Sequence, residues 1–269
     1  HTSTLTNGAG DNSYRYAGAN PNNYVCFGSS VSPCPTDNLY RIIGVFGDKV
    51  KLIKYDYATS SLLGTDGDYY AKYTYGSSTY KGSNYANIAS YYWNKSKRNN
   101  TWSESNLNKV NLNTNFINNI RSEWAAKIAE TTWKVSGHTT SAVTPKAMYT
   151  AEITNATNTY GPENGTSKIG LMYASDYGFA AAPSAWTANL NTYDGEAIIS
   201  VNWMYMGLYE WTISRDADDS HYAFIVDYGG AVSNDRVTGY DGVRPSFSLL
   251  SSTTYVSGSG SANDPIVIN

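Results

Sequence analysis

Aspartates are concentrated in one stretch of the chain, and they are the residues with the clearest capacity for chemistry. Two carboxyl groups can hydrolyse a glycosidic bond when one acts as the acid and the other as base or nucleophile. Aspartate is also common in turns, where its side chain accepts hydrogen bonds from nearby backbone N–H groups. A glycan-active hydrolase is therefore one alternative for a stretch that contains Asp216, Asp218, Asp219, Asp227, Asp235 and Asp241.

Nucleophilic catalysis has less support in the sequence. It requires a base within hydrogen-bond reach of a serine or cysteine, and the only histidines are His1, His138 and His221. No G-x-S-x-G elbow is present. His221 has carboxylates beside it, Asp218 and Asp219, and we interpret it as an exposed contact residue. We expect no catalytic residue and no enzymatic activity.

Metal and cofactor motifs are also weak. The run RDADDS at 215–220 resembles a calcium loop only loosely, because it lacks the glycine and the distal glutamate of an EF-hand. The pattern GTDGD at 64–68 is weaker still, and no glycine motif that cradles a phosphate is present. We therefore expect no bound metal and no cofactor.

The composition excludes two classes of partner. Only 15% of the 269 residues are charged, and the net charge is −3. Nucleic-acid binding needs clustered Lys and Arg, and the same lack of positive charge argues against an anionic membrane surface. No run of apolar residues is long enough to span a bilayer, so we expect no membrane insertion.

Tyrosine is unusually abundant, with 25 Tyr and 7 Trp among many Asn, Ser, Thr and Gly. This palette is typical of extracellular β proteins and of binding loops, in which Tyr supplies rigid contact area. Tyr also favours strands, so each single tyrosine has two equally good interpretations.

The two cysteines, Cys26 and Cys34, enclose the run FGSSVSP. They form no CxxC pair and have no neighbouring cluster that suggests zinc. A short disulfide-closed loop is the preferred interpretation, and it indicates an extracellular or cell-surface location. The start at His1 without a signal peptide suggests a mature or trimmed product.

The stretch 202–250 is the part around which the chain is organised. Residues 209–214 alternate in polarity, as do 223–226 and 243–249, and a period of two predicts half-buried strands. Gly229-Gly230 predicts a two-residue hairpin turn. Apolar ends thus enclose a polar middle, a layout that suits recognition better than catalysis.

This layout makes predictions for single side chains. Glu210 and Arg244 lie among apolar neighbours, where an unpaired charge is costly, so we expect them to pair. The frame residues Trp203, Trp211, Val243 and Phe247 should be buried, and Tyr222, Tyr228, Asn234 and Tyr240 should point outward in whole or part.

The rest of the chain predicts one α+β domain over 1–269, with a polar lead-in at 1–23. A hairpin around Gly47-Asp48 should follow, because Val- and Ile-rich runs flank this dipeptide. The remaining expected elements are short helices at 103–110, 114–120, 122–130 and 146–154, a strand at 131–137, apolar sheet at 168–183, a surface excursion at 184–200 and a closing strand after a Gly-Ser turn.

Several segments together resemble a known family. YRIIGVFGDKVKLIKYD, SYYWN, SNLNKVNLNTNFINNI, IGLMYASDYGFAA, NWMYMGLYEWTIS and GVRPSF, in this order, are similar to gut Firmicute-type surface and prepilin-like proteins of unassigned function. The resemblance covers most of residues 14–269.

The terminal part also resembles the C-type-lectin-like fold of formylglycine-generating enzymes and of the variable proteins of diversity-generating retroelements. The residues that carry this likeness are Trp211, Ser214, Arg215, Gly242, Val243 and Arg244. The calcium tripeptides of carbohydrate lectins are absent, and both cysteines lie near the N-terminus. The resemblance therefore implies the fold, a mixed antiparallel sheet with short helices and long loops, but not the oxidase activity.

Residues and resemblance together predict a surface-displayed, adhesin-like binding module whose retroelement-diversified surface lies at 215–241. The expected ligand is an unknown protein or glycan on another cell, host or phage surface. A structural pilin-like subunit is the main alternative, and the hydrolase is the less favoured one. The predicted ligand-binding residues are Asp218, Ser220, His221, Tyr222, Tyr228, Asn234, Asp235, Arg236 and Tyr240.

Overall fold

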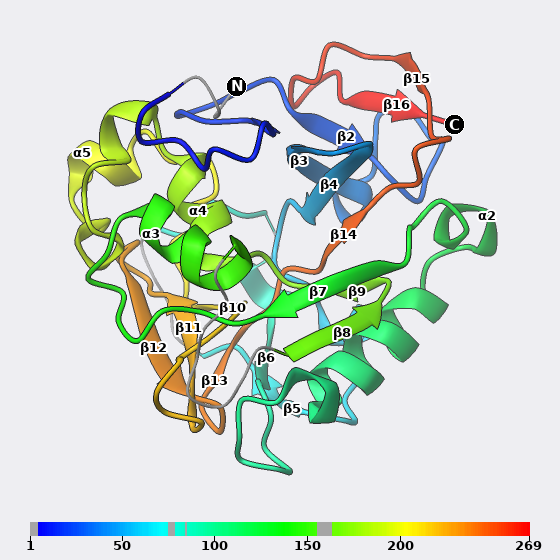
Figure 1. Ribbon diagram of the computed structural model, residues 1–269. Helices are drawn as coiled ribbons and strands as arrows, with labels where there is room; N and C mark the ends of the chain where they lie inside the picture. Colours follow the sequence, from blue (N-terminus) through cyan, green and yellow to red (C-terminus); the bar gives the residue numbers. More distant parts are fainter. Residues whose placement is uncertain (1–4, 75–78, 84, 155–162) are drawn as a thin grey trace.

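The computed structural model describes residues 5–74, 79–83, 85–154 and 163–269, so His1 lies outside the described residues. Two mixed sheets and a two-stranded ribbon form most of the regular structure, and the helices are short. Figure 1 shows β3, β4 and β14 in the upper half and β10–β13 with β5 and β6 in the lower half. The expectation of an α+β protein with short helices is confirmed.

The first sheet has the order β15-β16-β2-β3-β4-β14-β9, with β1 beside β3. In the predicted hairpin Phe46 pairs with Lys49, so Gly47 and Asp48 form the two-residue turn. The expected closing strand is also present, and it pairs in parallel with β2 near the N-terminus. The strands are β1 Tyr14–Arg15, β2 Tyr24–Cys26, β3 Leu39–Phe46, β4 Lys49–Lys54, β9 Ile169–Gly170, β14 Ser246–Ser248, β15 Tyr255–Ser257 and β16 Ile266–Ile268.

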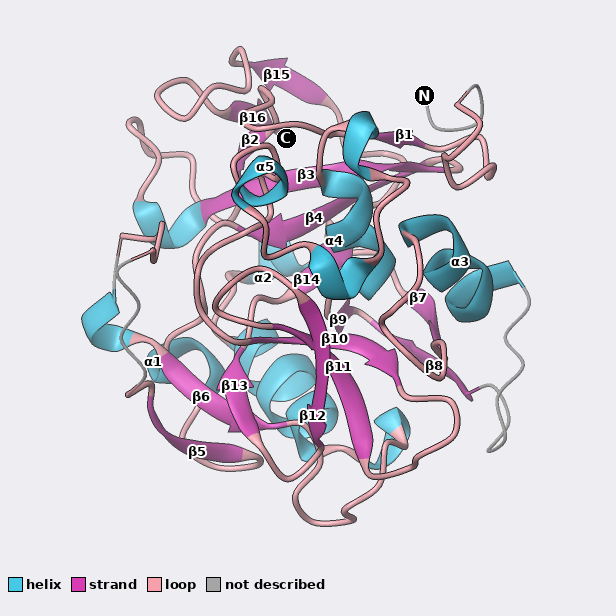
Figure 2. Cartoon of the chain, turned by 90° about the vertical axis from the view of Figure 1, so that its left-hand side faces the viewer, coloured by secondary structure: helices cyan, strands magenta, loops and turns pink. Residues whose placement is uncertain are grey.

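The second sheet, with the order β12-β11-β10-β13-β6-β5, draws most of its strands from the organising stretch 202–250. Figure 2 shows these strands side by side below the first sheet. Its strands are β5 Tyr69–Lys72, β6 Ala89–Tyr92, β10 Glu210–Arg215, β11 Tyr222–Val226, β12 Val232–Arg236 and β13 Tyr240–Gly242, and the separate ribbon joins β7 Thr131–Val135 to β8 Glu163–Ser167.

The predicted hairpin at Gly229-Gly230 exists, but its loop is longer than two residues. The last register pair of β11 and β12 is Val226 with Val232, which leaves 227–231 as the loop. The Asp227 carboxylate accepts backbone N–H groups from Gly229, Gly230 and Ala231 at 2.8, 2.8 and 3.1 Å. Only Gly230 of the two glycines has a positive φ, 105°. An aspartate-capped loop therefore replaces the expected tight turn.

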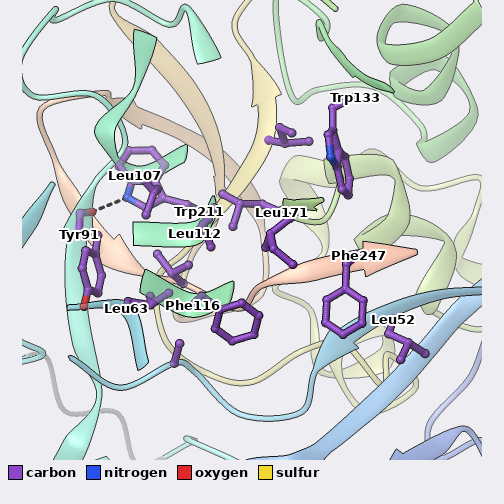
Figure 3. Packing of buried hydrophobic residues seen from close by; sticks show 14 of the residues in the cluster. Leu52, Leu63, Tyr91, Leu107, Leu112, Phe116, Trp133, Leu171, Trp211 and Phe247 are labelled. Atoms are coloured by element: carbon purple, nitrogen blue, oxygen red, sulfur yellow. Dashed lines mark hydrogen bonds between the residues drawn. The ribbon is translucent and has the colours of Figure 1, made fainter. Parts of the chain in front are cut away.

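The main hydrophobic core lies where the two sheets and the helix over 107–116 meet (Figure 3). Trp211 lies at its centre, and its Nε1 donates to the Tyr91 carbonyl at 2.7 Å. The β10 strand is buried along its whole length rather than on one face. The prediction for the frame is confirmed, because Trp203, Trp211, Val243 and Phe247 are all buried.

Glu210 and Arg244 form the predicted buried ion pair. The Arg244 Nε donates to Glu210 Oε1 at 2.7 Å, and its guanidinium also donates to the Met204 carbonyl at 2.8 Å. This pair joins β10 to the segment between β13 and β14. The two apolar ends of the organising stretch are thus tied together by one charged contact.

The helix predictions are correct in part. Short helical elements occur near all the predicted sites, but the one expected at 122–130 ends as a helix after Ala125. The α-helices are α1 Ser60–Leu63, α2 Ser122–Ala125, α3 Pro145–Tyr149, α4 Ala174–Ala180 and α5 Glu196–Ile199; Leu107–Phe116 and Thr150–Thr154 are π-helices, and Thr36–Asn38, Tyr85–Asn87, Trp102–Glu104, Pro183–Ala185 and Leu190–Thr192 are 3₁₀ turns.

The two helices expected at 103–110 and 114–120 are wrong, because a continuous helical segment crosses the proposed break. Asparagines were expected to interrupt the helix. Instead Asn111 Nδ2 donates to the Leu63 carbonyl at 2.8 Å, and Asn113 Nδ2 donates to the Ile169 carbonyl at 2.9 Å. Both amides thus bond to neighbouring segments, although Asn113 Nδ2 also donates to the Asn108 carbonyl of the same helix at 3.0 Å.

The expected sheet at 168–183 is also mostly wrong. Only β9 is a strand there, and α4 follows it with all seven residues buried. Every side of this helix is buried, Ser175 and Asp176 included, so no solvent-facing polar stripe distinguishes it from a buried strand. The excursion at 184–200 is not purely surface, since it buries Ala185, Trp186, Leu190 and Tyr193.

The predicted disulfide is present. Cys26 and Cys34 are bonded with an S–S distance of 2.05 Å and a Cα–Cα separation of 5.8 Å. The bond closes the loop after β2, which is the strand beside β3 and β16. Among the described residues, no helix is long and apolar enough to cross a membrane.

Candidate functional site

An open cleft of about 500 Å³ lies on the second sheet, within the organising stretch. It lies beside the single register pair that joins β10 to β13, Glu210 with Gly242, and β12 supplies part of its lining. Residues that precede β10, end β11 and begin β13 surround it. The lining consists of Tyr209, Ile225, Asp227, Ser233, Asn234, Asp235, Gly239, Tyr240 and Asp241.

Strand register explains why polar residues of β12 reach this cleft. Ile225 of β11 is opposite Ser233, and Ala223 is opposite Asp235. Cross-strand partners share one face of a sheet, so Ser233 and Asp235 lie on the same face as Ile225. On this face Ala223 and Ile225 of β11 belong to the main core, while Ser233 and Asp235 beside them on β12 line the cleft.

Asp241 is the most unusual residue of the cleft. Its side chain is on β13 and only 5% exposed. Within the part of the chain that the structure describes, its Oδ2 has no hydrogen-bond partner. Burial, and secondarily the negative charge of Asp235, raise the pKa of Asp241 well above its usual value. The result is a buried carboxyl group that favours its protonated form.

Two further carboxyl groups face the same space. Asp235 Oδ1 accepts the Arg236 backbone N–H at 2.6 Å. A side chain at Gly239 would place its Cβ 2.1 Å from Asp235 Oδ2, so glycine keeps this part of the cleft open. Burial raises the pKa of both Asp227 and Asp235, although backbone N–H donors oppose the shift at each.

Tyrosine rings form the rim. Tyr240 stacks on Tyr70 with ring centroids 3.8 Å apart and planes 18° apart, and Tyr92 meets Tyr240 edge-on at 6.3 Å. On the other side Tyr228, 55% exposed, meets Tyr209 edge-on at 5.4 Å. β5 and β6 bring Tyr70 and Tyr92 to β13, because Tyr240 is the register partner of Tyr92.

The ionisable side chains that line the cleft are therefore mainly acidic. Its lining includes three carboxyl groups, and no Lys or Arg is found among the described residues that form it. Hydroxyl groups and ring faces of tyrosine supply the remaining polar surface. The arrangement can accept hydrogen bonds from a ligand and can attract positive charge.

The predicted site residues separate into two groups. Asn234, Asp235 and Tyr240 line the cleft. Tyr228 lies at its rim, because its ring packs against Tyr209, which is a lining residue. The other five predicted residues, Asp218, Ser220, His221, Tyr222 and Arg236, belong to the opposite end of the β11–β12 hairpin.

That opposite end has its own local contacts. His221 Nδ1 is 3.0 Å from Asp219 Oδ1, and the Arg236 guanidinium lies 5.4 Å from the centroid of the Tyr222 ring. Asn234 is exposed, and its amide donates to Asp216 Oδ2 at 3.0 Å. Asp216 is thus occupied in organising the turn, and the structure does not bring the six aspartates into one cluster.

Sequence reasoning missed part of the cleft. In the sequence, Asp227 and Asp241 stand out only as members of an aspartate-rich stretch, and Tyr209 stands out only as part of an alternating strand. Tyr70 and Tyr92 lie far from the organising stretch in the sequence, and only the β5–β6–β13 pairing places them here. The sequence offers one signal for Asp241: it lies between Tyr240 and the run GVRP, where a carboxyl group would be buried.

A second cavity of about 340 Å³ lies between β1, β4, β7 and α4. Asp176 accepts Arg15 Nη1 at 3.0 Å and Lys51 Nζ at 2.6 Å, and Arg15 also pairs with Asp11 at 3.1 Å. Lys51 Nζ lies 4.4 Å from the centroid of the Tyr173 ring. Every charge of this buried cluster has an opposite charge as its neighbour, in contrast to the cleft.

Two remaining candidates have weak geometry for chemistry. His138 lines a separate shallow hollow, with Thr139 beside it. Glu152 is buried below α4, and burial raises its pKa to about 7 against hydrogen bonds from Ser175 and Ser214. In the described ranges no group of three or more His, Cys, Asp or Glu side chains is placed to hold a metal ion.

Comparisons with protein-family models, with curated proteins and with solved structures found no match to this chain.

Proposed function

We propose that this protein is a non-enzymatic, surface-displayed binding module whose ligand occupies the cleft between β10, β12 and β13. The observation that supports this most directly is the open volume of about 500 Å³ bordered by tyrosines and carboxyl groups. Tyrosine supplies contact area at low conformational cost. The cleft lies on a sheet whose strands are anchored by buried Trp211 and by the Glu210–Arg244 pair.

A C-type-lectin-like fold and a diversified surface belong to the same proposal. Parallel pairing of β2 with β16 and a hairpin-rich second sheet built from 202–250 are compatible with that fold. Diversification would act on the exposed positions of 215–241, and the two ends of the β11–β12 hairpin would then have different roles. The Cys26–Cys34 disulfide supports an extracellular location.

A glycan-active hydrolase is the second candidate, and one observation favours it. Asp241 is a carboxyl group with a raised pKa, and Asp235 is close enough to influence it. This is the relation between acid and base in glycosidases. If Asp241→Asn abolished turnover of a glycan by an otherwise active protein, the enzyme would replace the binding module as the better proposal.

The binding proposal is tested by a screen of the isolated chain against glycan and protein panels, followed by single substitutions. Tyr228→Ala and Tyr240→Ala should each weaken binding of the partner that is found, because aromatic anchors dominate interfaces. Tyr255→Ala is the matched control, since Tyr255 is 65% exposed on the distant edge strand β15.

The control separates the cleft from a general loss of surface tyrosine. Binding that survives both cleft substitutions in folded protein, or that responds equally to Tyr255→Ala, would contradict a ligand site in this cleft. Absence of any partner in the screen would favour the structural, pilin-like subunit.

A further inference from the structure

We propose that the cleft recognises a positively charged side chain, a lysine or arginine, presented by a protein partner. This inference rests on the proposed binding function and specifies the chemistry of its ligand. Both side chains offer the same features to the cleft, a cationic N–H donor group on an apolar stem.

The first support is the unsatisfied acceptor at the base of the cleft. Asp241 is more than nine-tenths buried, it lines the cleft, and its Oδ2 has no partner within the described residues. A buried polar atom that lacks a hydrogen bond costs free energy. A ligand that donates N–H to this oxygen removes that cost, so its affinity includes the gain.

The second support is the charge of the surroundings. Asp227 and Asp235 share the cleft with Asp241, and the described lining residues include no Lys or Arg. Asp227 and Asp235 attract a cation and repel an anion when they are ionised. A cation bound beside them also favours ionisation of Asp241. A neutral saccharide could donate hydrogen bonds but would gain nothing from this field.

The third support is the position of the aromatic rings. Tyr209 and Tyr240 line the cleft, and Tyr228 is packed edge-on against Tyr209. The electron-rich face of an aromatic ring attracts ammonium and guanidinium groups and also covers their aliphatic stems. Acidic base and aromatic walls are the combination by which proteins recognise organic cations.

The protein already contains the complementary arrangement in its own interior. In the second cavity Lys51 Nζ bonds to Asp176 at 2.6 Å and lies over the ring of Tyr173. There the cation is supplied by the chain itself. The cleft presents the same acceptor and ring chemistry, but no described Lys or Arg lines it; Arg236, which follows Asp235, is exposed outside the lining.

The test uses short blocked peptides with the full protein. Ac-Gly-Lys-Gly-NH₂ and Ac-Gly-Arg-Gly-NH₂ are titrated while the cleft is followed by NMR, with the Nε-acetyl-lysine peptide as the uncharged match and maltohexaose as the neutral saccharide. We expect at least one cationic peptide to bind about tenfold or more tightly than the acetylated one, as for a charge-assisted hydrogen bond. Shifts should centre on Asp235, Tyr240 and Asp241.

Variants assign the effect to the cleft. Asp235→Asn and Asp241→Asn should each weaken the binding of the cationic peptide severalfold, and Asp48→Asn should not. Asp48 lies in the exposed β3–β4 turn, so its substitution makes the same change in net charge away from the cleft. Because Asp235 is only partly buried, its variant keeps the test valid even if Asp241→Asn disturbs folding.

Acidity gives an independent readout. A bound cation favours the ionised form of Asp241, so its affinity should rise as the pH rises from the acidic range. Other groups that surround Asp241 are Asp227, Asp235, Tyr209 and Tyr240 of the lining and Tyr91 on β6, its register partner. Of these side-chain types only carboxyl groups ordinarily titrate in the acidic range, so they govern the dependence on pH there.

The outcomes separate the two proposals. Equal binding of the acetylated and cationic peptides would overturn the inference about charge. So would tighter binding of maltohexaose that is unaffected by Asp235→Asn. If that saccharide binding still depended on Tyr228 and Tyr240, the binding function would stand. If neither peptide shifts any cleft resonance, the cationic ligand is wrong, and the outcome of the partner screen alone decides the function.

Discussion

Asp176 and Asp241 are two buried aspartates with opposite surroundings. Their exposed fractions are 3% and 5%. Burial would raise the pKa of Asp176, but the Lys51 ammonium and the Arg15 guanidinium hold it below its usual value. At Asp241 burial acts with the repulsion of Asp235, and the pKa lies well above the usual value.

The comparison shows that burial alone does not define what a carboxyl group does. The second cavity has an internal charge balance, so its aspartate links β1, β4 and α4 as an ion pair. The cleft has an excess of acidic groups, and among the described residues Arg236 offsets it only in part, at Asp235. Stability should therefore depend strongly on Asp176, and recognition should depend on Asp241.

The largest expected effect is on the balanced side. Asp176→Ala leaves Lys51 and Arg15 without their shared partner in a buried setting. Removing one member of a buried ion pair costs about 3–5 kcal/mol of unfolding free energy. Urea denaturation at neutral pH measures it, and Asp48→Asn, an exposed loss of the same charge, is the control. A change in unfolding free energy below about 1 kcal/mol, the range of exposed pairs, would show that the cluster contributes little to stability.

A smaller effect, with a dependence on pH, is expected on the unbalanced side. The folded-state pKa of Asp241 is raised above the unfolded value near 3.8. Above that pH the folded state keeps a proton that the unfolded state has lost, so wild-type stability falls as pH rises until the folded pKa is passed. Asp241→Asn lacks this proton and should lose less stability with rising pH.

The measurement is the difference in unfolding free energy between Asp241→Asn and wild type at several pH values. The difference should move in favour of the variant from about pH 4 upward, by at most about 1.4 kcal/mol per pH unit. Groups that do not interact with Asp241 contribute equally to both proteins and cancel, so the difference reports Asp241 together with its neighbour Asp235. A difference that is constant with pH would show that Asp241 ionises normally and would remove the contrast with Asp176.

The organising stretch could be predicted because its signals are local. The alternation at 209–214, the hairpin turns and the Cys26–Cys34 loop can each be recognised within a short run of residues. The Glu210–Arg244 pair follows from the free-energy cost of an unpaired charge among apolar neighbours. The two cavities depend on contacts between distant segments. Arg15 and Asp176 are 161 residues apart, and Lys51 and Asp176 are 125 apart. No spacing rule connects them, and the same is true of Tyr70 and Tyr240.

Two errors have the same physical origin. The run at 174–180 forms a helix that is buried on all sides, and such a helix has no solvent-exposed face to reveal its period. The asparagines of 107–116 were treated as helix breakers, although their amides bond to other segments. In both places tertiary contacts determine the secondary structure. Asn234, Asp235 and Tyr240 lie at the cleft because β12 and β13, which line it, belong to the organising stretch.

The smallest effect on stability is expected for a tyrosine at the rim of the cleft. A tyrosine of the second cavity is changed in parallel as the reference. Tyr149 lies at that cavity, is only 7% exposed, and has the Arg15 guanidinium 5.4 Å from its ring centroid. Tyr149→Ala should cost about 3–5 kcal/mol, as for a buried aromatic residue. Tyr228 at the cleft rim is 55% exposed, and Tyr228→Ala should change stability by less than about 1 kcal/mol. Thermal or urea unfolding of both variants gives the result. If Tyr228→Ala were as destabilising as Tyr149→Ala, the rim would be part of the structural frame, and its tyrosines would no longer support a surface that is free to bind a partner.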